Sequence, residues 1–476
     1  MVNEILTEDF WQIIVTETNR YASQILRNDT HKLKKYEDNW RDTNVDEMKA
    51  YFALCILMSQ VKKNNIQSYW SKRGIIETPI FRKTMPFWRF AQLSRFLHFT
   101  NNDVEDNNND RLWKLRSVID YFNEKFKTIY TPEEKVSLDE SLMKYTGRMA
   151  YKQYNPSKRA RFGVKFYKLY ESKSGYCIQF KIYTGQDRNK NADTSASESV
   201  TMFMCTPISG YGHTLFLDNW YSSPSLFAKL QSIKTNAIGT ARCNRKNMPK
   251  ELASAKLKQS DVISRSSNGI LVAKWKDKKD IYIMSTKHSK IEMIEVEKKR
   301  WKNNNNDTVT KPNIVLEYNH GMGGVDLQDS YLSSFSLMRK YIKSYKKIFF
   351  YLADVALFNS YVLFCKKMDI GKSKKFSFSK FRLDVAEQLL QAVCIPDYEK
   401  RGTMSVGSTP DRLEAKQWRH FPRNIPPTNA KQNPRRRCRV CTKHKQRSET
   451  VWECKKCLVP LHIPHCFERY HTLHDY

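Results

Sequence analysis

The last 39 residues of the chain concentrate side chains that bind metals. Two cysteine pairs, Cys438 with Cys441 and Cys454 with Cys457, each have two residues between their members and are separated by 12 residues. Thiolates at this spacing, followed by further Cys and His residues, are typical of tetrahedral zinc sites. The trailing candidates are His462, His465, Cys466, His471 and His474. Because one ion needs only four ligands, the pattern predicts two zinc ions in a cross-brace arrangement.

Two aspartates lie within apolar segments, where burying a carboxylate is energetically unfavourable. Asp139 is flanked by strand-like residues in VSLDESL, and Asp218 closes the apolar run LFLD. Burying a carboxylate there is unfavourable unless a divalent cation or hydrogen bonds compensate its charge. Asp326, after a glycine turn, is a third candidate, and carboxylates that converge on two Mg²⁺ ions can support cleavage of a phosphodiester. Taken singly, each aspartate is more often a helix cap or a hydrogen-bond acceptor.

The elements around these residues predict an α/β core. Strand patterns cover 135–145, 163–172 and 176–185, the last two joined by a turn, and a fourth strand ends in Asp218. A helix opened by proline follows over 223–233, and 236–242 supplies a fifth strand. Three antiparallel strands, a fourth strand, a helix and a fifth strand are the order that an RNase H-like core requires.

Helices and an insertion complete the pattern. Segments 9–26 and 45–61 have helical spacing, and the Lys-rich stretch 245–312 contains short strand-like pieces that indicate an inserted β-rich domain. The apolar run 348–364 is short for a membrane span and contains Asp354, so we interpret it as a buried helix. Four prolines between 422 and 434 indicate a linker.

The charge of the chain predicts a polyanionic partner. The sequence has 82 Lys and Arg against 49 Asp and Glu, a formal charge of +33. Nucleic acid is the first candidate because neutralised phosphates release counterions, and an anionic membrane surface is the alternative. No lipidation motif or signal-peptide pattern is seen, and six of the 11 cysteines are scattered singly, which favours a reduced intracellular protein over a disulfide framework.

Four sequence blocks resemble the signatures of the piggyBac transposase family, in the family's order. They are SLDESLMKYTGR, YNPSKRARFGVKFYKLYES, LFLDNWYSS and GMGGVDLQD, and the resemblance extends over most of the chain. Within the family, the sequence most resembles the mammalian and bat piggyBac-like elements. Family members usually begin with a long acidic segment, so the start of this chain raises the expectation of an N-terminal truncation.

The resemblance implies both a reaction and its residues. The family's catalytic carboxylates correspond to Asp139, Asp218 and Asp326, which would bind Mg²⁺ or Mn²⁺, and a further essential aspartate corresponds to Asp329. Asp326 and Asp329 are three residues apart, which puts them on one face of a helix. Family members nick transposon ends, use the freed 3'-hydroxyl to form a hairpin at TTAA, and insert at another TTAA.

The resemblance also implies the residues that contact DNA and zinc. The family's basic stretch matches Lys158, Arg159, Arg161 and Lys165, and its Arg-Lys pair matches Arg339 and Lys340. The basic segment 431–447, which includes Arg435, Arg436 and Arg437, suits DNA phosphates or nuclear import. His462, Cys466 and His471 match the family's zinc ligands. We take His474 as the eighth ligand, with His444 and His465 as competitors.

Together these expectations describe a nuclear, homodimeric transposase with seven segments. In chain order, we expect a helical dimerisation and DNA-binding domain (1–134), an RNase H-like core (135–244), an insertion (245–312), the end of the core (313–335), the second part of the helical domain (336–420), a linker (421–434) and a zinc domain (435–476). One alternative is a domesticated DNA-binding relative without catalysis. Another treats the zinc end as a histone-tail reader or a ubiquitin-ligase-like module.

Overall fold

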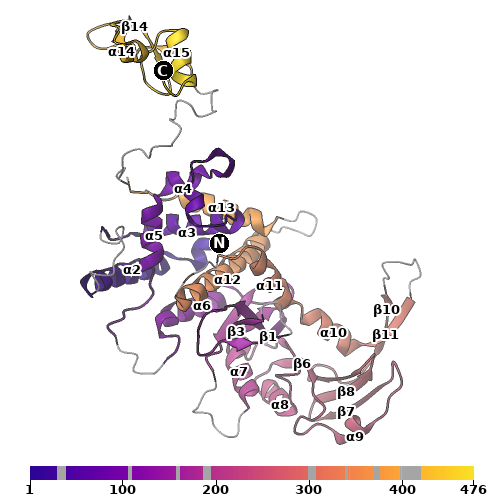
Figure 1. Ribbon diagram of the computed structural model, residues 1–476. Helices are drawn as coiled ribbons and strands as arrows, with labels where there is room; N and C mark the ends of the chain where they lie inside the picture. Colours follow the sequence, from indigo (N-terminus) through magenta and orange to yellow (C-terminus); the bar gives the residue numbers. More distant parts are fainter. Residues whose placement is uncertain are drawn as a thin grey trace. The chain divides into compact units, whose positions relative to one another are not determined.

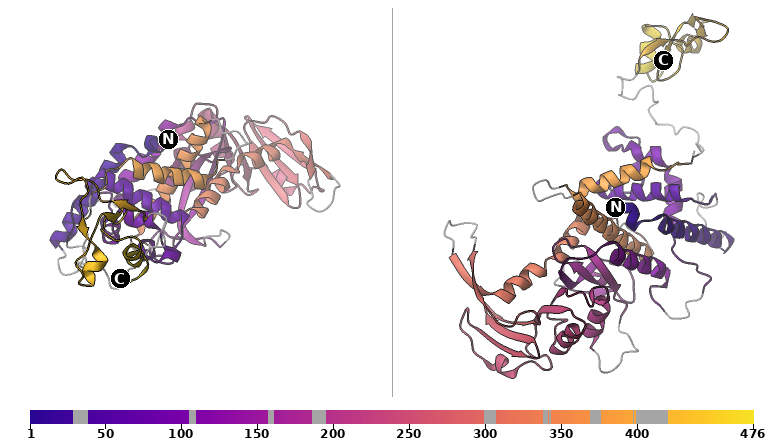
Figure 2. Two further views of the ribbon diagram at one scale, coloured as in Figure 1. Left: turned by 90° about the horizontal axis from the view of Figure 1, so that it is seen from above. Right: turned by 180° about the vertical axis from the view of Figure 1, so that it is seen from behind.

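The computed structural model describes the chain as two compact units, Met1–Asp397 and Tyr398–Tyr476. The residues described are 1–28, 39–104, 110–156, 161–185, 195–298, 307–337, 341, 343–368, 376–396, 398 and 420–476. In the first unit, the helices of the first 130 residues gather at one end and the strands of residues 135–312 at the other (Figures 1 and 2).

A mixed nine-stranded sheet forms the centre of the first unit. The five strands expected from the sequence are all present, in the spatial order β4-β3-β1-β5-β6. Strand β3 is antiparallel to both β4 and β1, whereas β1, β5 and β6 run parallel to one another. Their bounds, with the short edge strand β2, are β1 Lys135–Lys144, β2 Gln153–Tyr154, β3 Phe162–Glu171, β4 Cys177–Ile182, β5 Thr214–Leu217 and β6 Asn236–Ala241.

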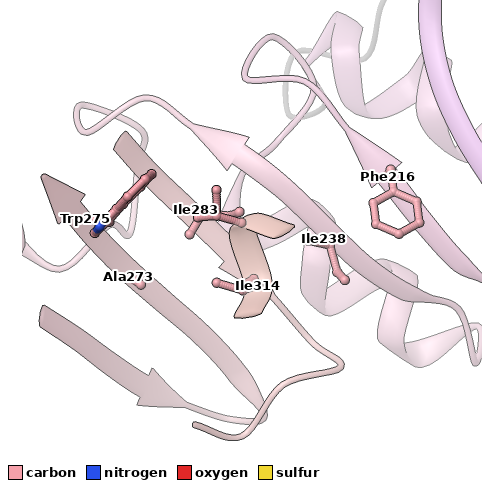
Figure 3. Packing of buried hydrophobic residues seen from close by; sticks show 7 residues of the cluster. Phe216, Ile238, Ala273, Trp275, Ile283 and Ile314 are labelled. Atoms are coloured by element: carbon pink, nitrogen blue, oxygen red, sulfur yellow. The ribbon is translucent and has the colours of Figure 1, made fainter. Parts of the chain in front are cut away.

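The insertion is rich in strands, but three of them extend the core sheet instead of forming a sheet of their own. Strand β9 pairs antiparallel with β6, and β8 and β7 follow outward. One apolar cluster crosses this junction, from Phe216 and Ile238 to Trp275 and Ile283, beneath Ile314 (Figure 3). The bounds are β7 Val262–Ser267, β8 Ile270–Lys276, β9 Asp280–Ser285, and a separate pair β10 Met293–Lys298 with β11 Asp307–Pro312.

Five helices accompany the core strands. Of these, α11 packs against β1 and β3, α10 packs against β1, β6 and β9, and α8 packs against β6 and β8. Their bounds are α7 Ala196–Met204, α8 Pro224–Ser232, α9 Lys250–Ser254, α10 Asn313–Gly321 and α11 Gly324–Ser334, with the 3-10 turn η5 Thr206–Ile208. Ser223 caps α8 through Leu226 N–H, and Pro224 occupies its first turn, as the sequence predicts.

The helical part is assembled from both ends of the first unit. Helix α13 packs against α3 and α12, so the segment after the core rejoins the N-terminal helices. A buried ion pair between Arg382 and Asp354, with Ser59 as a second partner of the guanidinium, joins α13, α12 and α3. The bounds are α1 Val2–Ile5, α2 Glu8–Asn28, α3 Val45–Gln60, η2 Gln67–Trp70, η3 Gly74–Ile76, α4 Pro79–Thr84, α5 Phe87–Phe96, η4 Trp113–Leu115, α6 Arg116–Ile129, α12 Ser344–Lys367 and α13 Phe378–Gln391.

Helix α12 is the one helix among the described residues that is long and apolar enough to cross a membrane. Within its most apolar window, 78% of the residues are buried inside the protein. Both Asp354 and Asn359 on this helix are buried and hydrogen-bonded. The run 348–364 is therefore a buried helix, as the sequence predicts.

The second unit is small and has little apolar core. Its buried cluster consists of Cys438, Val440, Cys454 and Leu461. Part of the segment expected to be a linker is structured, because β12 pairs with β15 and brings residues 422–424 into this unit. Pro422 begins this edge strand, a position that proline tolerates. The bounds are β12 Pro422–Asn424, β13 Arg436–Arg437, α14 Arg439–Lys443, β14 Glu449–Thr450, β15 Trp452–Cys454 and α15 His465–Thr472.

Candidate active site and metal centres

Asp139 and Asp218 lie side by side at the same end of two parallel strands. In the register of β1 and β5, Leu138 is the partner of Leu217, and the two aspartates are the next residues. Since side chains alternate between the faces of a sheet, both carboxylates project from one face, that of Ser137 and Phe216. Both side chains are half-buried.

Backbone donors orient these two carboxylates. The N–H of Glu140 donates to Asp139 Oδ1 at 2.7 Å, and the N–H of Asn219 donates to Asp218 Oδ1. Thr240 Oγ1 on β6 is 3.4 Å from the same oxygen of Asp218. These hydrogen bonds fix the orientation of both carboxylates before a cation binds, which limits the reorganisation that binding requires.

The glycine motif at 321–324 brings α10 and α11 onto this face. A Cβ at Gly321 would lie 2.4–2.5 Å from three ring atoms of Phe216, whereas a Cβ at Gly323 would meet nothing within 4 Å. A residue without a side chain is required at the first position, because α10 rests directly on the strand that ends in Asp218. Helix α11 then begins at Gly324 and carries Asp326, which is exposed, and Asp329, which is half-buried.

Electrostatic effects on two tyrosines link Asp139 with Asp218 and with Asp329. Burial raises the pKa of Tyr318 on α10 to about 12, and the charges of Asp218 and Asp139 contribute to the rise. Burial also raises the pKa of Tyr170 on β3 well above its usual value, with further contributions from Asp329 and Asp139.

The aspartates are spread more widely than a single-ion site requires. Among the described residues, only two Cys/His groups bring three or more ligand atoms within 4.8 Å of one another, and neither contains an aspartate. Two cations about 4 Å apart would bind different members of an aspartate set. Among the described residues, Asp139, Asp218 and Asp326 do not form such a compact ligand group.

Basic and aromatic side chains surround the turn after Asp218. Lys165 Nζ lies 3.0 Å from Glu140 Oε1 and 4.8 Å from the centre of the Trp220 ring. Arg245 donates to the carbonyl oxygens of Asn219 and Trp220 at 2.9 and 2.6 Å, and Arg242 Nε reaches Asn219 Oδ1 at 3.3 Å. Sequence reasoning missed both arginines: Arg245 holds the backbone that follows a candidate metal ligand, and Arg242 holds the Asn219 side chain.

Four of the other residues predicted to contact DNA lie in the part of the chain that the structure describes. Arg161 is exposed at the start of β3, and Arg435, Arg436 and Arg437 are exposed beside and within β13. Arg436 is also 3.8 Å from Glu453. The predictions for Lys158, Arg159, Arg339 and Lys340 concern positions outside the described residues.

In the second unit, the first Cys/His group joins Cys438, Cys441, His462 and Cys466. Cys441 Sγ is 3.5 Å from His462 Nδ1 and 3.8 Å from Cys466 Sγ. Burial alone would raise the pKa of Cys438, but backbone N–H groups of Cys441, His462 and Val440 lower it to about 7. Such donors favour the thiolate, which is the form that binds metal.

The second group joins Cys454, Cys457, His471 and His420. His420 Nδ1 lies 3.5 Å from Cys454 Sγ and 3.4 Å from Cys457 Sγ, and His471 Nε2 is 3.6 Å from Cys457 Sγ. His474, which the sequence analysis took as the eighth ligand, belongs to neither group and is exposed. The correction has a structural cause: β12 pairs with β15, which brings the residue before Phe421 to the second cysteine pair.

Both groups fit zinc. With Zn–S of about 2.3 Å and Zn–N of about 2.0–2.1 Å, tetrahedral ligand atoms lie roughly 3.5–3.8 Å apart. The ligand atoms that are in contact within the two groups lie 3.4 to 3.8 Å apart. The second ring nitrogen of two histidines also has a partner: His471 Nδ1 is 2.7 Å from Phe467 O, and His462 Nε2 is 3.1 Å from Glu449 O. The groups alternate along the chain, which is the cross-brace order expected.

Comparison with known proteins agrees with these features. The sequence family described as Transposase IS4 matches residues 2–361. Human PiggyBac transposable element-derived protein 3 is 26% identical over 440 residues, covering 90% of this chain and 70% of the relative. Human PiggyBac transposable element-derived protein 2 is 26% identical over 363 residues, covering 74% and 58%. A cryo-electron microscopy structure of a piggyBac transposase synaptic complex with hairpin DNA matches with a TM-score of 0.71 at 21% identity, covering 97% of this chain and 94% of that one.

Proposed function

Because this chain belongs to the Transposase IS4 family, and within it to the piggyBac group, we propose that it is a cut-and-paste DNA transposase. The observation that carries the proposal is the register of β1 and β5, which makes Asp139 and Asp218 neighbours on one face beside α11. We assign Asp139, Asp218 and Asp326 as metal ligands and Asp329 as a fourth essential carboxylate. The strand order β4-β3-β1-β5-β6 supports an RNase H-like core.

The residues of the chain account for the steps of phosphoryl transfer. Two divalent cations, when bound, would activate the attacking oxygen and stabilise the leaving oxygen of the phosphodiester. Asp139 and Asp218 hold positions set by backbone N–H donors. Asp326 lies in the first turn of α11, which packs against β1, and in this proposal it completes the metal site. Lys165 and the arginines that brace the Asn219 turn supply positive charge close to where a DNA backbone would pass.

In this proposal, the chain cuts transposon ends, forms hairpins at TTAA through the freed 3'-hydroxyl, and inserts at a new TTAA. The second unit, with two zinc ions and the exposed Arg435, Arg436 and Arg437, binds the terminal repeats. The protein acts in the nucleus as a homodimer. A charge of +33 supports DNA as the partner over a histone tail, which is itself basic.

A DNA-binding role without catalysis is the second candidate. It is favoured by the human relatives, which are named as derived from transposable elements. Strand cleavage distinguishes the two. An end-labelled duplex that carries the element's own terminal repeat beside TTAA would be incubated with the full chain and Mg²⁺.

We expect a nick and then a hairpin from the wild type, and neither product from Asp139→Asn, Asp218→Asn or Asp326→Asn. Affinity for the same duplex should be unchanged, because the basic surface is intact. Asp277→Asn, in the exposed turn between β8 and β9, is the matched control and should cleave normally. Binding without cleavage by the wild type would favour the non-catalytic role.

A further inference from the structure

A lysine is completely buried next to the candidate metal ligands. Lys168 lies in the middle of β3, and its partner across the strand pair is Asp139. Its Nζ donates to Gln328 Oε1 at 2.9 Å and to Tyr351 OH at 2.8 Å. Burying an ammonium group is strongly unfavourable unless hydrogen bonds and an opposite charge compensate it.

The partners of Lys168 come from two helices that carry or support the site. Gln328 lies on α11 between Asp326 and Asp329, and Tyr351 lies on α12. The amide of Gln328 also accepts from Tyr170 OH at 3.2 Å and donates to Gly175 O at 3.2 Å. One buried network therefore joins β3 to α11 and α12.

The same network reaches β1. Tyr351 OH is 2.9 Å from Ser141 Oγ, two residues after Asp139 on the same face. The strand and the helix that carry the candidate ligands are thus connected through Lys168 and Tyr351.

Charge also links Lys168 to the site. Burial lowers the pKa of Lys168, but Tyr351 and Asp329 raise it, and the result lies above the ordinary value. Lys168 is therefore charged in the folded protein, and Asp329 is the carboxylate whose charge acts on it.

We propose that Lys168 is a positioning residue, which fixes α11 against β1 and β3 through Gln328 and so holds Asp329 near Asp139. This inference rests on the proposed nuclease function. A stability role alone would not require a lysine, because methionine has a similar length and a buried ion can often be replaced by an apolar side chain without loss of stability. A charged group with fixed partners does set the rotation and height of a helix, whereas apolar packing tolerates small shifts.

The test compares Lys168→Met with Lys274→Met in the full chain. Lys274 on β8 is also buried, but its partners, Ala255 O at 2.7 Å and Asp280 at 3.1 Å, both lie in the insertion. Three quantities are measured for each variant: the Mg²⁺ concentration for half-maximal cleavage, the affinity for the end duplex, and hydrogen–deuterium exchange of residues 324–334.

We expect Lys168→Met to raise the Mg²⁺ requirement by roughly tenfold or more, the effect of losing one charge-assisted hydrogen bond. Exchange in α11 should rise by a similar factor while DNA affinity stays the same. Lys274→Met should change neither the Mg²⁺ requirement nor exchange in α11. An unchanged Mg²⁺ requirement and unchanged exchange in Lys168→Met would overturn the inference.

The inference can still be tested if Lys168→Met does not fold or if the wild type does not cleave DNA. If Lys168→Met does not fold, Tyr351→Phe removes only the hydroxyl that bonds Lys168 and Ser141, and it must shift both readouts in the same direction. If the wild type does not cleave DNA, the proposed function fails, yet exchange in α11 still decides whether Lys168 holds this helix.

Discussion

The identity of the eighth zinc ligand can be tested with two histidines of one unit. The structure assigns His420 to the group of Cys454, Cys457 and His471, and it leaves His474 exposed outside both groups. Changing His420 to Ala should therefore weaken one zinc site, whereas changing His474 to Ala should weaken none.

The size of the effect follows from the ligand count. Structural zinc binds with an apparent free energy of about 10–16 kcal/mol, so one of four ligands contributes about 3 kcal/mol. Losing it should lower the affinity of that site roughly a hundredfold. The other group shares no ligand with this one and should keep its ion.

Native mass spectrometry of the full chain, after dialysis against a competing chelator, counts the ions that remain. We expect two zinc ions per chain in the wild type and in His474→Ala, and one in His420→Ala. Loss of an ion from His474→Ala with two ions kept by His420→Ala would refute the assignment made from the contacts of His420 Nδ1.

Three other perturbations address the core and the partner. Gly321→Ala should lower the free energy of unfolding by about 1–3 kcal/mol through the clash with Phe216, while Gly323→Ala should cost less than about 1 kcal/mol, as measured by urea denaturation. Burial lowers the pKa of His98 to about 4, so the unfolded chain binds a proton that the folded chain excludes, and stability falls as pH drops below 6.5. The wild type should lose about 2 kcal/mol more than His98→Gln between pH 7.5 and pH 5 in the same denaturation experiment. Affinity for end DNA, measured by fluorescence anisotropy, should fall steeply between roughly 50 and 200 mM salt, and a flat dependence would argue against phosphate contacts.

Local pattern was sufficient for the strands and for the buried helix. The five core strands were predictable because each is an apolar run bounded by turn residues, and 348–364 was predictable because its polar residues interrupt a membrane-like run. The joining of β9 to β6 was not predictable, since periodicity indicates that a segment is a strand but not which strand it pairs with. Helix α7 is likewise absent from the elements expected from the sequence.

Part of the candidate site could likewise be predicted from the sequence, and part could not. The neighbourhood of Asp139 and Asp218 follows from two parallel strands, once their register is known. The roles of Arg245 and Lys168 depend on contacts with distant segments, which a single sequence does not reveal. His420 was overlooked because ligand spacing rules are local, and it lies 18 residues before the first cysteine of the cluster.

The central claim, that Asp139, Asp218 and Asp326 hold divalent cations, can be tested without relying on cleavage of DNA. Fe²⁺ substituted for Mg²⁺ generates hydroxyl radicals when ascorbate and peroxide are added, and these cut the protein backbone next to the bound ion. We predict cuts close to residues 139, 218 and 326 in the wild type, suppressed by excess Mg²⁺ and absent from Asp218→Asn. Cuts elsewhere in the first unit, or an unchanged pattern in Asp218→Asn, would contradict the account.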